Sequence, residues 1–154
     1  MSNKQGYQQV KIREIPSEWN VEKLGRVIEI EKGRKPSQYF VEPNEKMIPY
    51  LLAESIRTGI YDKWVDPDAD LVLVDKDDPV LIWDGSKSGD VFIGLKGALA
   101  STMVKIKPQE ERIEKKFLYY FLKTRFYILN FKTTGTAVPH VSKNVFDNLR
   151  LPIP

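Results

Sequence analysis

The chain lacks cysteine altogether and contains a single histidine among its 154 residues. Without cysteine there can be no disulfide scaffold, thiolate metal site or cysteine nucleophile. One histidine, His140, excludes a multi-histidine zinc or iron site within this chain. Long apolar runs are missing too, since none approaches the roughly 20 residues needed to cross a bilayer. The N-terminal stretch has no apolar signal core, so we expect a cytoplasmic protein.

What the chain does contain is the composition of a folded globular protein. It is 42% hydrophobic, 29% charged and 11% aromatic, which argues against disorder and low complexity. Its length suits one domain with a substantial core. We expect residues 1–14 to form a polar N-terminal tail and residues 15–154 to form a single domain.

Charge is distributed unevenly along the chain, although the formal net charge is only +3. Residues 1–40 carry eight basic and five acidic groups, residues 41–80 carry four and ten, and residues 81–154 carry twelve and six. Such segregation can give one face a positive field, and it is equally compatible with solvated surfaces that differ in sign. Charge alone therefore leaves nucleic-acid binding open.

Short apolar or alternating runs, bounded by glycine, proline or polar residues, predict several strands. They cover residues 23–31, 47–52, 71–74, 80–83, 91–93 and 101–106. From residue 110 to residue 131 the apolar residues recur at four-residue spacing, which predicts one amphipathic helix of about six turns. A short segment that begins at Ser142, a suitable N-cap, precedes the C-terminal Leu-Pro-Ile-Pro. The predicted fold is α+β, with a curved, mostly antiparallel sheet and one long amphipathic packing helix.

Several segments partly resemble catalytic or metal-binding motifs, but each lacks residues that the motif requires. The acidic run Asp66–Asp70 starts like a calcium loop but lacks the glycine and the glutamate that an EF-hand needs at its sixth and twelfth positions. The segment Gly85–Gly89 has the composition of a phosphate loop without its spacing or a following helix. His140 has no second histidine or cysteine to work with, and we interpret it as a packed or loop-fixing residue. The sequence predicts no catalytic residue, no metal and no cofactor.

The order of several segments resembles the target recognition domain of a type I restriction-modification specificity subunit. These segments are IPSEWNVEKLGRVIEIEKGRKPS, IPYLLAESIRTGIYD, PVLIWDGSKSGDVFIGLKGALASTMVKIKP, KKFLYYFLKT and GTAVPHVSKNVFDNLRLPIP. The most specific stretch combines Gly135-Thr136, His140-Val141, Leu149 and the closing Leu151-Pro-Ile-Pro154. The likeness runs from about Ile15 to Pro154.

This resemblance implies a non-enzymatic reader of double-stranded DNA. A specificity subunit of this kind usually carries two recognition domains separated by long helices, and each domain reads half of a split target. Methyltransferase and restriction subunits assemble around it. Because this sequence holds one recognition domain and neither spacer helix nor second domain, the resemblance implies a piece of a subunit or a half-length subunit that self-associates.

Loops rich in basic and hydroxyl side chains supply the expected contacts, because Arg and Lys meet phosphates while Ser, Thr, Gln and His can also reach base edges. The residues expected to contact DNA are Arg34, Lys35, Gln38, Ser86, Lys87, Lys96, Thr134, Thr136, His140 and Lys143. Two alternatives remain open at this point. One is the recognition end of a fused methyltransferase-nuclease, and the other is a general RNA-binding or protein-interaction domain.

Overall fold

The computed structural model describes residues 15, 16, 18–131 and 138–154. The tail predicted for residues 1–14 lies outside these residues, as do the candidate contact residues Thr134 and Thr136. In chain order the elements are β1 (Asn20–Lys23), α1 (Leu24–Val27), β2 (Ile28–Lys32), β3 (Ile48–Leu51), α2 (Ala53–Thr58), β4 (Trp64–Val65), β5 (Leu73–Val74), β6 (Val80–Ile82), β7 (Val91–Phe92), β8 (Gly97–Leu99), β9 (Met103–Pro108), α3 (Lys115–Lys123), α4 (Phe126–Phe131), α5 (Lys143–Asp147) and β10 (Arg150–Ile153).

The strands of the described residues form three sheets. A two-stranded ribbon pairs β1 with β10, and a central sheet has the order β2-β9-β6-β7 with antiparallel neighbours. A second four-stranded sheet has the order β4-β3-β8-β5, in which β3 and β8 run parallel. The predicted α+β class and the mostly antiparallel pairing are confirmed, and the strands are divided among separate sheets.

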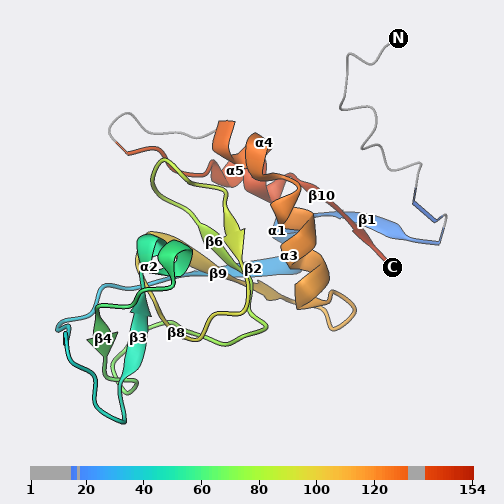
Figure 1. Cartoon of the computed structure of the whole chain (residues 1–154). Helices are drawn as coiled ribbons and strands as arrows, with labels where there is room; N and C mark the ends of the chain where they lie inside the picture. The colour runs from blue at the N-terminus through green and yellow to red at the C-terminus, as the bar shows by residue number, and fades with distance from the viewer. Residues whose placement is uncertain (1–14, 17, 132–137) are drawn as a thin grey trace.

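The central sheet lies between two hydrophobic cores because successive side chains of a strand point to opposite faces. In β9, Val104 and Ile106 belong to the core beneath the helices, whereas Met103 belongs to the core shared with the second sheet. In β6, Leu81 belongs to the core beneath the helices and Ile82 to the core shared with the second sheet. Figure 1 shows α3, α4 and α5 on one side of this sheet and β3 and β4 on the other. The alternation predicted for residues 103–106 therefore produces a three-layer arrangement.

The helical segment that follows β9 is not the single helix predicted over residues 110–131; it consists of α3 and α4. The Thr124 hydroxyl donates a 2.7 Å hydrogen bond to the Phe121 carbonyl, and the Arg125 amide donates a 2.9 Å bond to the Leu122 carbonyl. Both bonds span three residues, so they tighten the last turn of α3 and redirect the chain. The apolar period continues across the break, which is why the sequence pattern did not reveal it.

The strand predicted over residues 23–31 is also shorter than expected, because residues 24–27 form the helical turn α1. Leu24 and Val27 are both buried, as residues three apart on one face of a helical turn can be. A Cβ on Gly25 would lie 2.7 Å from the Cβ of Asp147, so this glycine allows α1 to approach α5 closely. The predicted cap is confirmed, because the Ser142 hydroxyl caps α5, and Gly59 ends α2 in a left-handed conformation.

A buried carboxylate, Asp78, connects the central sheet to α3. Its side chain accepts a 2.7 Å hydrogen bond from Lys115 and a 2.9 Å bond from the Asp75 amide, and Lys105 Nζ lies 3.3 Å away. Burial alone would raise the pKa of Asp78, but the bonds from Lys115 and Asp75 and the charge of Lys105 together hold this pKa below its ordinary value. The ionised carboxylate therefore stabilises the folded state.

We expect Asp78→Asn to lower the free energy of unfolding by about 2 kcal/mol at neutral pH, because a charged hydrogen-bond acceptor is lost from a buried site. The pKa of Asp78 is lower in the folded chain than in the unfolded one, so its stabilising contribution is complete above the ordinary value of 3.8. It is lost as the pH falls through the depressed folded value. Urea titrations of both proteins between neutral pH and pH about 3 should therefore converge at the acidic end. The exposed neighbour Asp77 is the control, and a constant difference at all pH values would contradict this assignment.

Phe121→Ala should destabilise the domain by about 3 kcal/mol, because it removes a buried ring from the helix-side core. Phe121 is 8% exposed, and the Arg125 guanidinium lies 4.5 Å from its ring centre. Chemical denaturation measures the change. Tyr120→Ala in the same helix is the control, since this side chain is 56% exposed. An effect of Phe121→Ala no larger than that of the control would show that the core does not depend on this ring.

Candidate functional site

The turn between β8 and β9 holds the chain that leaves β2. The Gly33 amide donates a 2.9 Å hydrogen bond to the Met103 carbonyl, and the Arg34 amide donates a 3.1 Å bond to the Leu99 carbonyl. The backbones approach so closely that a Cβ on Gly33 would overlap the carbonyl oxygen of Ala100. Glycine at position 33 therefore allows the two backbones to come close enough for the hydrogen bonds that fix the start of the segment carrying Arg34 and Lys35.

The same turn also holds the chain that leaves β6. The amides of Trp83 and Asp84 both donate to the Thr102 carbonyl, at 2.9 and 3.0 Å. One residue further on, the Gly85 amide donates a 2.7 Å bond to the Pro139 carbonyl. Three segments distant in the sequence, residues 33–38, 84–87 and 139–143, are thus linked through backbone hydrogen bonds. We call the surface that they form the loop rim; in Figure 1 it follows the ends of β2 and β6 and the chain that enters α5.

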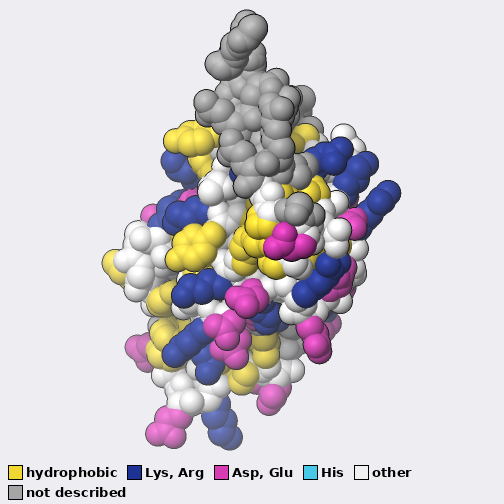
Figure 2. All heavy atoms as spheres, turned by 90° about the vertical axis from the view of Figure 1, so that its right-hand side faces the viewer, with side chains coloured by type: hydrophobic (Ala, Val, Ile, Leu, Met, Phe, Trp, Pro, Cys, Tyr) yellow, Lys and Arg dark blue, Asp and Glu magenta, His cyan; other side chains and the backbone are white. Residues whose placement is uncertain are grey.

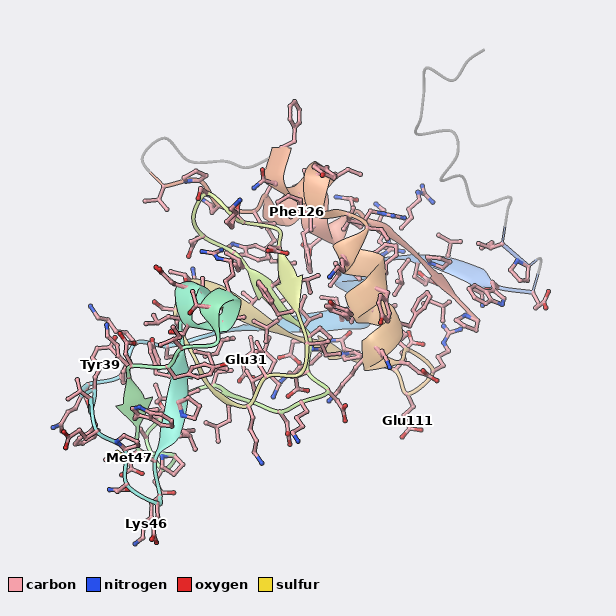
Figure 3. The ribbon with its side chains drawn as sticks, viewed as in Figure 1. Glu31, Tyr39, Lys46, Met47, Glu111 and Phe126 are labelled. Carbon is pink, nitrogen blue, oxygen red and sulfur yellow. The ribbon has the colours of Figure 1, made fainter. Side chains whose placement is uncertain are left out.

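The first segment of the loop rim carries Arg34, Lys35 and Gln38, all exposed. Its far end is anchored by Tyr39, which lies beside β4 in Figure 3 and whose ring packs 5.2 Å from the ring of Tyr50. The Tyr50 hydroxyl donates a 2.9 Å bond to the Arg34 carbonyl. Burial, together with the neighbouring Tyr39, raises the pKa of Tyr50 to about 12, so this hydroxyl remains a donor at physiological pH.

The second segment carries Ser86 and Lys87, which are both exposed. Residue Asn130 of α4 fixes the backbone of this segment, because its side-chain amide donates hydrogen bonds to the carbonyls of Ser86 and Ser88 at 3.0 and 2.9 Å. The side chains at the tip therefore project from a fixed backbone.

The third segment carries His140 and Lys143. The half-buried His140 pairs with Asp84 through a backbone β-bridge, which agrees with its interpretation as a loop-fixing residue. Lys143 lies in the first turn of α5, and its Nζ is 2.6 Å from the Asp147 carboxylate. Thr134 and Thr136, predicted for this region, lie outside the described residues.

Lys96 is the described candidate that the structure does not bring to the loop rim. It immediately precedes Gly97 at the start of β8, whereas the loop rim is attached beyond Leu99 at the other end of that strand. Lys96 instead lines a separate cavity of about 320 Å³ with Asp75, Asp78 and Lys105.

Several cations of the loop rim are paired with carboxylates of the same chain. Arg34 lies 2.6 Å from Asp70, and Lys32 at the end of β2 lies 3.1 Å from Asp84. Within the part of the chain that the structure describes, Lys35 and Lys87 form no ion pair, so their charge is available to a ligand. The pairing of Lys32 with Asp84 was missed from the sequence; the lysine was visible at the end of an alternating run, but its partner is 52 residues away.

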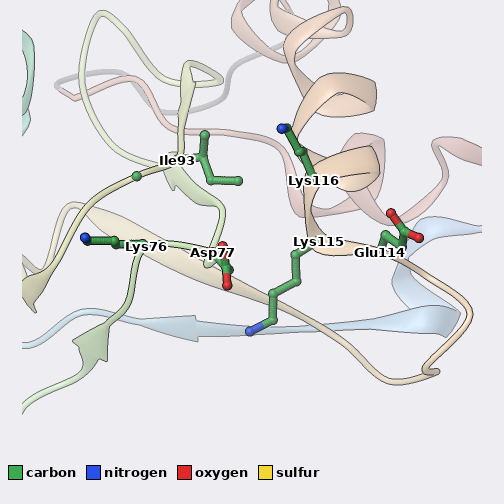
Figure 4. Close-up of a pocket in the computed structure, with 7 residues that line it drawn as sticks. Lys76, Asp77, Ile93, Glu114, Lys115 and Lys116 are labelled. Atoms are coloured by element: carbon green, nitrogen blue, oxygen red, sulfur yellow. The ribbon is translucent and has the colours of Figure 1, made fainter.

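Other surfaces of the domain have a different character. A cavity of about 470 Å³ between β7 and α3 is lined by Lys76, Lys115 and Lys116 together with Asp77 and Glu114, so its charges are mixed (Figure 4). On the face over α3, β1 and β10, basic and acidic side chains alternate with hydrophobic ones (Figure 2). Among the described residues there is no cluster of three or more potential metal ligands and no helix that could cross a membrane.

The loop rim is suited to binding an extended polyanion rather than to catalysis. It offers exposed cations that can bind phosphates, and it offers amide, hydroxyl and imidazole groups that can form hydrogen bonds. The backbone that carries these side chains is already held by hydrogen bonds within the domain. Catalysis by this surface would need a nucleophile or a general base beside a reacting group. The arrangement instead spreads its polar groups along three adjacent segments.

Comparison with known proteins gives a consistent result. Residues 16–154 match the family model described as the type I restriction modification DNA specificity domain. Two relatives come from Methanocaldococcus jannaschii: the type I restriction enzyme MjaVIII specificity subunit is 39% identical over 91% of this chain, and a putative MjaX specificity subunit is 23% identical over 96%. The chain spans 33% and 36% of their lengths.

Solved structures show the same fold. The HsdS subunit from Thermoanaerobacter tengcongensis superposes with a TM-score of 0.64 at 18% identity, covering 91% of this chain and 34% of that one. The type I restriction-modification S subunit from M. genitalium gives a TM-score of 0.61 at 15% identity, covering 94% of this chain and 36% of that one. These structures confirm the predicted fold class, and the family model and the 39% identical relative confirm the family resemblance.

Gly33→Ala should disturb the loop rim, because the added methyl group meets a backbone carbonyl that cannot rotate away. We expect a loss of about 2 kcal/mol of stability and faster hydrogen exchange at the Arg34 amide, which NMR can follow. Gly59→Ala is the control: this glycine has a positive φ but nothing within 4 Å, so the strain there should be about 1 kcal/mol and the Arg34 amide should stay protected. Unchanged exchange at Arg34 in the Gly33 variant would show that the contact does not fix this segment.

Proposed function

The chain belongs to the type I restriction-modification DNA specificity domain family, and from this premise we propose that it binds double-stranded DNA in a sequence-specific manner. In this proposal the domain reads one half of a bipartite target. The observation that carries the proposal is the loop rim, in which backbone hydrogen bonds bring basic and hydrogen-bonding side chains from distant parts of the sequence onto one surface. Membership of a specificity family agrees with the predicted role as a non-catalytic component.

We assign the side chains of the loop rim to two tasks. Lys35 and Lys87, whose charges are available, hold phosphates and so contribute affinity without sequence preference. Gln38, Ser86 and His140 have the donors and acceptors needed to reach base edges. Because several other cations are already paired within the chain, we expect a single domain to bind weakly, with a dissociation constant in the micromolar range.

The proposed partners are the methyltransferase and restriction subunits of a type I system, which would act in the cytoplasm on the DNA that this domain selects. The chain spans about a third of the relatives that it matches, so docking of these subunits is assigned to the complete specificity subunit. Self-association is expected only if the domain is part of a half-length subunit.

Lys87→Ala should weaken binding to all duplexes alike and should lower the slope of log K against log salt by about 0.9, the value for one phosphate contact. Fluorescence anisotropy of a mixed-sequence duplex, measured from about 50 to 200 mM salt, gives both quantities. Lys116→Ala is the matched control, because Lys116 lies on α3 beside the mixed-charge cavity and away from the loop rim (Figure 4).

Two outcomes would contradict the proposed function. One is the absence of binding at tens of micromolar duplex at the lowest salt by a protein whose fold is intact. The other is competition by RNA that is stronger than competition by duplex DNA, which would favour the general RNA-binding alternative. Methylation of DNA by the purified chain with S-adenosylmethionine would instead favour the fused methyltransferase alternative.

A further inference from the structure

Two large aromatic side chains are exposed on one face of α4. Tyr127 is 82% exposed and Phe131 is 85% exposed. They are four residues apart, so they lie one above the other on the same face of the helix. The opposite face of this helix is anchored in the core by Leu129, which is fully buried. Tyr127 and Phe131 are therefore exposed because α4 packs on the core through its opposite face.

The end of α4 is attached to the loop rim at the segment that carries Lys87. The Asn130 side chain donates to the carbonyls of Ser86 and Ser88. Gly89 lies against the helix so closely that a Cβ there would be 2.9 Å from the Cβ of Leu129. The backbone of Phe131, the next residue after Asn130, is therefore held close to a loop whose lysine is available to bind a phosphate.

We propose that Phe131, supported by Tyr127, forms a hydrophobic contact with the duplex that Lys87 holds by its phosphates. This inference rests on the proposed function and adds a kind of contact that the basic and polar candidates cannot make. Apolar side chains next to phosphate-binding groups pack against sugars and thymine methyl groups, or wedge between base steps. Duplex DNA is favoured over a protein partner because α4 is attached to the loop that carries Lys87, whose charge forms no ion pair among the described residues and so suits a phosphate.

Tyr120 provides a comparison within the same helical layer. It is 56% exposed, and its ring packs 5.0 Å from that of Tyr119. It belongs to α3, before the break at Thr124, and among the described residues its side chain makes no hydrogen bond to the loop of Lys87. Removing its ring should therefore change exposed apolar area without changing the DNA contact.

The test is Phe131→Ala in the full chain, with Tyr120→Ala as the matched control. We expect Phe131→Ala to weaken binding of a mixed-sequence duplex by about tenfold, as the loss of one stacking or packing aromatic does. The slope of log K against log salt should remain that of the parent protein, because an apolar contact releases no counterions. Lys87→Ala should do the reverse and reduce the slope. The unfolding midpoint should be unchanged in both aromatic variants.

Photocrosslinking gives a direct readout. A duplex containing 5-iodouracil should crosslink to Phe131 or Tyr127 in the parent protein, as peptide mass spectrometry can locate. Parent-like DNA affinity of Phe131→Ala, with no crosslink at either residue, would overturn the inference while leaving the proposed function intact. Loss of association with a methyltransferase subunit by Phe131→Ala, with DNA binding unchanged, would assign this face to a protein partner instead. Failure of the parent protein to bind duplex DNA would remove both proposals.

Discussion

The backbone carbonyls of the turn between β8 and β9 are the constraint on which the loop rim depends. The carbonyls of Leu99, Thr102 and Met103 accept amides from the ends of β2 and β6. Each of these bonds joins parts of the chain that are distant in sequence, and each requires the backbones to approach closely, which Gly33 permits. A buried backbone group without a partner is costly, and the carbonyls of the buried residues Leu99 and Met103 find their partners in the chain that leaves β2. The framework and the functional surface are therefore held together by the same bonds.

Ion pairing between distant segments offsets part of the uneven charge of the sequence. The acidic block at residues 41–80 supplies Asp70 to Arg34 and Asp78 to Lys105 and Lys115. Charges that are segregated along the chain are therefore matched across layers in the fold. What remains available at the loop rim is a small number of lysines, which agrees with the weak DNA binding that we propose for a single domain.

Much of the fold could be predicted because its signals are local. The alternation of residues 103–106, the left-handed end of α2 at Gly59 and the cap at Ser142 each depend on a few adjacent residues. The break between α3 and α4 involves the Thr124 hydroxyl and the Arg125 amide, and a periodic apolar pattern does not reveal either bond. The assembly of the loop rim was accessible only in part: its residue types were visible, but the pairing that excludes Lys96 depends on which end of a three-residue strand meets the turn.

The pairing of β1 with β10 determines how the domain can be connected to flanking polypeptide segments. Asn20 lies opposite Ile153 and Lys23 opposite Arg150, so the chain enters and leaves the fold along neighbouring strands (Figure 1). Paired strands are about 4.8 Å apart, and this separation is set by the ribbon rather than by the loops. Variation in the loop rim therefore does not alter the spacing or direction at which flanking segments are attached. Replacing the loops of the loop rim should therefore leave the attachment of flanking segments through β1 and β10 unchanged.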